Sequence, residues 1–203
     1  MKTVTVMLLT LLLTSCSLGG VTQPTLFYTL SPYAEPISSR TKTDVSIGLG
    51  PISLPLLLDR PQMVLRRSNT EVDVDEFHRW GEDLSENLSH VMVRNLMHDL
   101  HTDRIARYPW PDYRHLDYQI AIEVFQFDAQ FGDKVILEGV WSLVDLKQHQ
   151  ERIIARFSIH ENILAPAYKA VADAHSQALM RLSQRIAKAV KTSLSESIQE
   201  KRP

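Results

Sequence analysis

The sequence is poor in residues that several common classes of protein require. It holds one cysteine, Cys16, which excludes an intramolecular disulfide and a cluster of cysteine ligands around a metal. Its 22 Lys and Arg residues do not outnumber its 24 Asp and Glu residues, and the formal net charge is −2. A typical nucleic-acid-binding protein has a strong positive excess. We therefore expect neither a disulfide-bonded scaffold nor a nucleic-acid partner.

The sequence also lacks the motifs of common catalytic and phosphate-binding sites. No Gly-x-Ser-x-Gly sequence is present, which argues against an α/β-hydrolase of the usual type. Gly48 and Gly50 lead directly into Pro51, whose nitrogen lacks the hydrogen that a phosphate-binding loop donates. His98 and His101 could reach one metal from a helix, but spacing fixes no third ligand, and a polar helix end explains them more simply. We expect no catalytic residues, no metal and no cofactor.

One long apolar run occurs in the chain, and it lies at the N-terminus. Residues 4–13 follow Lys2 and are too few for a spanning helix, which needs about 20 residues. Their length is typical of a signal peptide. The next residues, Leu13-Thr14-Ser15-Cys16, resemble the lipobox of bacterial lipoproteins. That resemblance implies cleavage before Cys16 and acylation of this residue. The alternative is an ordinary secretory signal followed by a chance cysteine.

The residues after Cys16 indicate a destination and a tether. In enterobacterial-type lipoproteins an aspartate after the cysteine favours retention at the inner membrane, so Ser17 indicates the outer membrane, facing the periplasm. Residues 16–25 contain two glycines and a proline and no charge, which predicts a lipidated tether after a signal peptide of residues 1–15. Residues 26–203 are then expected to form a single domain.

Strand and helix patterns alternate along the predicted domain. Strand candidates at 26–30 and 45–52 precede a predicted hairpin, whose strands are residues 63–67 and 71–74 and whose turn contains Ser68-Asn69. A helix is predicted over 83–101. Asp83 and Glu86 can form a capping pair at its start.

The second half of the chain predicts a sheet and a second helix. Three alternating segments between residues 118 and 159 have short connections, which favours an antiparallel meander. A long helix follows over 166–195, and its apolar stripe includes His175, which we expect to be a hydrogen-bonded core residue. The sequence thus predicts an α+β fold: a mixed, largely antiparallel sheet with two long helices packed on it.

Two apolar features favour a surface that binds a partner. Four leucines lie within residues 51–61, where three prolines argue against a regular strand or helix; they either bury under the domain or meet a partner. Two tryptophans flank the predicted first helix and a proline turn, and they are either interface anchors or a cluster that caps the core. The candidate partner-binding residues are Leu54, Leu56, Leu57, Leu58, Trp80 and Trp110.

Several segments, together with the lipobox, carry a family resemblance. They are Phe27–Leu30, Ile47–Pro55, Leu58–Gln62, Trp80 before the helix, Tyr108–Trp110 and Phe125–Asp128. Together they resemble the PqiC (YmbA) family, the auxiliary lipoproteins of MCE-type ABC transport systems, over nearly the whole chain after Cys16. Leu56 departs from the family pattern, since members often carry a more polar residue there.

The resemblance implies a fold similar to the N-terminal domain of TolB and a protein that is not an enzyme. It implies a lipid-anchored subunit at the outer membrane that docks a periplasmic MCE-domain protein and its transporter complex and supports envelope integrity. A homo-oligomeric ring would suit a partner with rotational symmetry. Cys16 is the one residue whose role carries over. The alternatives are a lipid-binding shuttle, which would hold acyl chains in its own cavity, and a surface-attached hydrolase.

Overall fold

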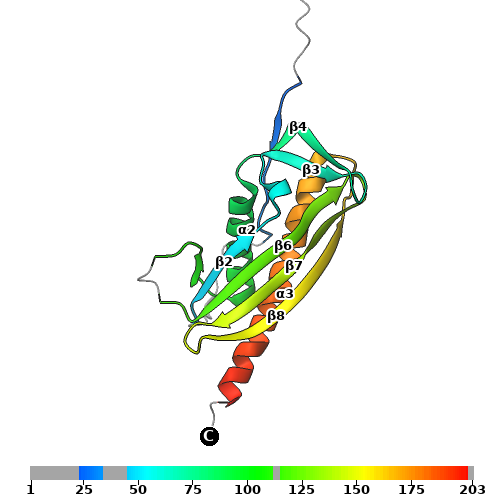
Figure 1. Ribbon diagram of the computed structural model, residues 1–203. Helices are drawn as coiled ribbons and strands as arrows, with labels where there is room; N and C mark the ends of the chain where they lie inside the picture. The colour runs from blue at the N-terminus through cyan, green and yellow to red at the C-terminus, as the bar shows by residue number, and fades with distance from the viewer. Residues whose placement is uncertain (1–22, 34–44, 112–114, 201–203) are drawn as a thin grey trace, which may run out of the picture.

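The fold is a single mixed sheet with two helices on one face. The computed structural model describes residues 23–33, 45–111 and 115–200, with side chains up to residue 196, so the predicted signal peptide and Cys16 lie outside the described residues. Helices α2 (Leu84–Leu100) and α3 (Tyr168–Glu200) lie side by side behind the sheet of eight strands (Figure 1). This confirms the predicted α+β fold. Among the described helices, none combines the length and apolar character needed to cross a membrane.

The three longest strands of the sheet form the predicted antiparallel meander. It consists of β6 (Tyr118–Gln130), β7 (Lys134–Asp145) and β8 (Gln150–Asn162). Residues of β7 alternate strictly between buried and half-exposed, because one face of the sheet packs on the helices and the other lies open. A bulge at Phe125 stands opposite Gly139, where any Cβ would overlap the carbonyl oxygen of Glu123. Only glycine fits at this position.

Two branches of short strands share the other edge of β6. In one branch, β2 (Ile47–Ser53) pairs in parallel with β6 and β5 (Ile105–Arg107) pairs in parallel with β2. In the other, β3 (Gln62–Arg66) meets β6 in parallel, β4 (Val72–Trp80) pairs antiparallel with β3, and β1 (Leu26–Tyr28) is parallel to β4. The β3–β4 pair confirms the predicted hairpin, but β4 continues well past the predicted end at Val74.

The segment with three prolines is more regular than the sequence predicted. Strand β2 continues through Pro51, and Leu56–Leu58 form a short 3₁₀ helix, η2. The expectation of no regular structure was wrong because the pairing of β2 with β6 shifts register between Leu49 and Ile52. That irregularity accommodates a proline, which cannot donate a ladder hydrogen bond.

The two helices cover different parts of the sheet. Helix α2 packs on β2 and β5, whereas α3 packs on β7, β8 and α2. The Asp83 carboxylate accepts a hydrogen bond of 3.0 Å from the backbone N–H of Glu86, which confirms the predicted cap of α2. The apolar stripe of α3 is buried as predicted, and its members with almost no exposure are Val171, Ala178, Leu179, Leu182, Ile186 and Val190.

Candidate functional site

The six predicted partner-binding residues differ widely in exposure. Leu56 is 84% exposed, whereas Leu58 and Trp80 are buried in the core at 5% and 6%. Leu54, Leu57 and Trp110 are partly buried. Two of the six side chains are therefore not available at the surface of the domain. The prediction of a partner-binding surface here now depends mainly on Leu56.

The geometry of η2 explains why neighbouring leucines point to different environments. The backbone N–H of Leu58 donates to the carbonyl of Pro55 at 2.9 Å, and that of Asp59 donates to the carbonyl of Leu56 at 3.2 Å. A 3₁₀ helix has three residues per turn, so three consecutive side chains leave its axis in three directions. Leu58 therefore enters the core while Leu56 faces solvent.

The two tryptophans that were candidate partner-binding residues both pack against other residues of the domain. Trp80 ends β4, where its ring meets His175 edge-on at 5.5 Å and its backbone N–H donates to the carbonyl of Pro61 at 2.7 Å. Trp110 meets Tyr108 edge-on at 5.4 Å and lies so close to Gly48 that a Cβ there would come within 2.8 Å of the indole. Of the two interpretations of the tryptophans, Trp80 fits a cluster that caps the core. Trp110 covers the start of β2.

An exposed apolar end, which the sequence did not reveal, lies at β1. Leu26 is 50% and Phe27 66% exposed, and Phe77 of the adjacent strand β4 is 38% exposed. Leu26 pairs with His78 and Phe27 with Arg79, so Phe77 stands one residue before this ladder. We call Leu26, Phe27 and Phe77 the β1 tip. Sequence reasoning assigned Leu26 and Phe27 to a strand, but only the sheet order makes this strand an edge.

A cleft of about 730 Å³ lies beside the start of α3, and its charges are paired. Arg66 forms an ion pair with Asp128 at 2.6 Å, and Arg67 forms one with Asp73 at 2.5 Å. The cleft is also lined by Phe131 and Tyr168. Because each arginine already faces a carboxylate, the cleft has little free charge with which to bind an anion.

Asp75 links β4 to α3 near this cleft. Burial alone would raise the pKa of Asp75, but hydrogen bonds from Tyr168, His78 and the backbone of Phe77 lower it to about 2. Burial and the bond to Asp75 raise the pKa of Tyr168. The rings of His78 and Tyr168 stack at 3.7 Å. The carboxylate thus stays ionised and holds the start of α3 against the sheet.

The described residues were predicted to hold no metal site, and the buried histidine was predicted to be structural. Within residues 23–33, 45–111 and 115–200, no group of three His, Cys, Asp or Glu side chains is placed to hold a metal ion. His175 lies between Trp80 and Phe127 and its Nδ1–H donates to the carbonyl of Val171 at 2.8 Å. Burial lowers the pKa of His175 to about 4, so it is neutral near pH 7. This confirms the prediction that His175 is a hydrogen-bonded core residue.

Comparison with solved structures identifies the fold. A crystal structure of an uncharacterized protein is 18% identical with a TM-score of 0.68, covering 83% of this chain and 99% of that one. A Xanthomonas campestris protein of the DUF330 family is 17% identical with a TM-score of 0.68, covering 86% and 99%. TolB from Acinetobacter baumannii is a weak neighbour, with a TM-score of 0.34 and 12% identity, covering 86% of this chain and 32% of TolB.

Comparison of sequences identifies the family. No curated protein matches this chain. Residues 28–187, however, match the family model of the ABC-type transport auxiliary lipoprotein component. The match covers most of the chain: it begins at Tyr28, the last residue of β1, includes η2, α2 and every later strand, and ends within α3. It confirms the resemblance drawn from the segments between Phe27 and Asp128. The chain belongs to the family of ABC-type transport auxiliary lipoproteins.

Proposed function

We propose that this protein is a non-catalytic outer-membrane lipoprotein that docks the periplasmic MCE protein of an intermembrane lipid-transport system. Lipidation of Cys16 anchors the chain, and the domain supplies the docking surface. Two or more acyl chains hold a protein stably at a membrane, whereas one does not. The observation that carries the proposal is the family match over residues 28–187, because this family serves ABC-type transport.

The packing of the domain favours docking over a lipid-carrying shuttle. Side chains from the sheet and from both helices fill the space between these two layers. The fully buried ones include Phe127 of β6, Met92 and Leu96 of α2 and Leu179 of α3. The cleft of about 730 Å³ is open and lined by the paired arginines Arg66 and Arg67. A shuttle must remove the acyl chains of its lipid from water, which requires an enclosed apolar cavity. This open cleft is not such a cavity.

Self-association into a ring is part of the proposal. Strand β8 has 13 residues and, in the described sheet, pairs on one side only, with β7. An unpaired strand edge presents backbone donors and acceptors to a neighbouring chain. A closed ring of such copies would present repeated docking surfaces to a partner with rotational symmetry.

Affinity capture from native envelopes tests the proposal. The full-length lipoprotein is isolated from detergent-solubilised envelopes, and mass spectrometry identifies the proteins, the lipids and the modified N-terminal peptide. Recovery of an MCE-domain protein with ABC-transporter subunits, and of acylated Cys16, is the expected result. A Cys16→Ser variant is the matched control, and its N-terminal peptide is expected to carry no acyl chain. Recovery of the lipoprotein alone with stoichiometric bound phospholipid would instead support the shuttle.

A further inference from the structure

We infer that the β1 tip, formed by Leu26, Phe27 and Phe77, inserts into the lipid headgroup region of the membrane that holds the anchor. The inference rests on the proposed lipidation of Cys16, because lipidation brings β1 close to a bilayer. The occupant of this apolar surface is therefore a lipid surface. A second copy of the chain is the competing occupant that the experiment below excludes or supports.

The position of the tip in the chain is the first argument. Nine residues separate Cys16 from Leu26, so at most about 35 Å of extended chain joins the acylated residue to β1. Strand β1 projects from one end of the molecule (Figure 1). Of the described residues, those nearest the anchor along the chain thus include two exposed large apolar side chains, Leu26 and Phe27.

The charge pattern is the second argument. From Cys16 to Ala34 the sequence contains no Asp, Glu, Lys or Arg, and the first charged residue after the anchor is Glu35. On the neighbouring strand, Arg79 is opposite Phe27 in the register and is neutralised by Glu76, with 2.8 Å between Nη2 and Oε2. When the β1 tip enters the headgroup region, the surface that loses water is mainly apolar and carries few charges. Such a contact depends little on anionic lipids.

The third argument is that the tip is fixed to the domain. The backbone N–H of Gly81 donates to the carbonyl of Tyr28 at 2.7 Å, and that of Leu30 donates to Asn87 Oδ1 at 2.6 Å. The backbone N–H of Ser31 donates to Ser176 Oγ at 3.1 Å. Because both helices hold the chain directly after β1, insertion of the tip orients the whole domain and not only the tether.

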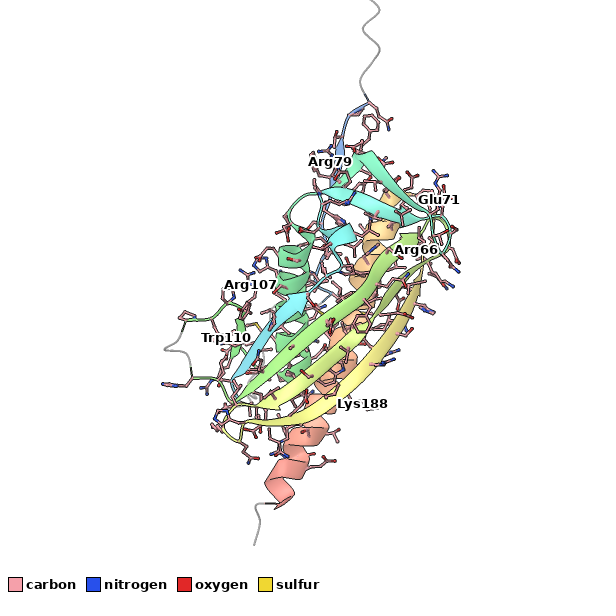
Figure 2. The ribbon with its side chains drawn as sticks, in the orientation of Figure 1. Arg66, Glu71, Arg79, Arg107, Trp110 and Lys188 are labelled. Atoms are coloured by element: carbon pink, nitrogen blue, oxygen red, sulfur yellow. The ribbon has the colours of Figure 1, made fainter. Side chains whose placement is uncertain are left out.

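Insertion determines which end of the molecule faces away from the membrane. Figure 2 places Arg79 at the end that carries β1 and Trp110 toward the opposite end, where Lys188 of α3 also lies. Tyr108, next to Trp110 in the aromatic pair, is 49% exposed. With the β1 tip in the interface, the Tyr108–Trp110 end is presented to the periplasm.

Site-specific labelling of the full-length lipoprotein tests the inference. Cys16 is the only cysteine and its thiol is blocked by acylation, so Phe27→Cys provides a unique thiol for an environment-sensitive fluorophore. Ile154→Cys is the matched control, because Ile154 is 65% exposed and Phe27 is 66% exposed. Each variant is reconstituted into vesicles of phosphatidylethanolamine and phosphatidylglycerol, with and without lipids brominated on their acyl chains.

The expected result is a blue shift and loss of emission at position 27 on addition of brominated lipid, with neither change at position 154. The loss at position 27 should persist when phosphatidylglycerol is omitted. Equal, unquenched emission at both positions in vesicles that float with the protein would overturn the inference and leave lipidation intact. Failure of the unlabelled protein to float would contradict the anchor itself. A blue shift at position 27 that depends on protein concentration in detergent, without lipid, would assign the tip to a second copy.

Discussion

The backbone N–H of Leu30 lies 2.6 Å from Oδ1 of Asn87, although 57 residues separate the two in the chain. Both groups are buried, and the bond joins the chain that leaves β1 to the first turns of α2. Thr29 Oγ1 also donates to the same amide oxygen at 3.2 Å. One side chain thus satisfies two donors at the point where the chain leaves β1 and enters the domain.

Removal of this acceptor should destabilise the domain. We expect Asn87→Ala to lower the free energy of unfolding by about 1–3 kcal/mol, because it leaves the buried N–H of Leu30 without a partner. Ser176→Ala is the matched control: it removes the acceptor of an exposed bond to the N–H of Ser31, which water can replace. Urea denaturation monitored by tryptophan fluorescence measures both. Equal losses of unfolding free energy in the two variants would show that the buried bond to Asn87 stabilises the domain no more than the exposed one.

Two adjacent arginines should differ sharply in their contribution to stability. Arg66 donates through Nε and Nη2 to Asp128, whose side chain is only 4% exposed. Arg66→Ala would leave this buried carboxylate unpaired, and we expect a loss of about 3–5 kcal/mol. Arg67 and Asp73 are 62% and 41% exposed, so Arg67→Ala should cost about 0–1 kcal/mol.

Thermal and urea unfolding of both variants at pH 7 gives the comparison. Gln126 also donates to Asp128, at 2.8 Å, and cannot replace the positive charge. Similar midpoints for Arg66→Ala and Arg67→Ala would contradict the claim that burial of the partner sets the energy.

The buried histidine predicts how stability depends on pH. Burial lowers the pKa of His175 to about 4, against 6.5 for the unfolded chain. Above pH 6.5 both states are neutral at this residue and its contribution is complete. Between pH 6.5 and 4 the unfolded chain takes up a proton that the folded one excludes, so stability falls by up to about 3 kcal/mol. Below pH 4 this contribution is lost.

Comparison with a neutral variant isolates the histidine from the carboxylates that also titrate in acid. His175→Asn keeps a donor near Nδ1 for the carbonyl of Val171, which the histidine reaches at 2.8 Å. We expect this variant to be less stable at pH 7 but to lose less stability between pH 6.5 and 4.5 in urea titrations. The same slope in both proteins would assign the pH dependence to other groups.

The exposed leucine of η2 should separate docking from folding. Leu56→Asp is expected to change the free energy of unfolding by less than about 0.5 kcal/mol, because the side chain is 84% exposed. If this surface docks the partner, the variant also loses capture of the MCE-domain protein. Leu58→Asp buries a charge and is expected to prevent folding. Circular dichroism measures folding, and affinity capture measures binding of the partner. Full capture of the partner by Leu56→Asp would show that Leu56 is not part of the docking surface.

Local patterns predicted much of the fold but only part of the candidate site. The alternation in β7 and the apolar stripe of α3 are properties of consecutive residues, and both were confirmed. The end of β4 was missed because Asp73, Asp75 and Glu76 give no alternation, and Asp75 instead accepts bonds from Tyr168 and His78. The exposure of Leu56 beside the buried Leu58 could not be read from a run of leucines.

By itself the sequence determined the α+β class and the family segments, because each depends on residue types at fixed local spacing, and it predicted lipidation at Cys16. Only the tertiary structure decided that β1 is an edge strand with exposed apolar residues, that Trp80 packs on His175, and that β2 and β3 share one edge of β6. Parallel pairing between distant segments depends on the free energy of the whole packed domain. No spacing within the chain encodes which of its apolar residues the packed domain leaves exposed.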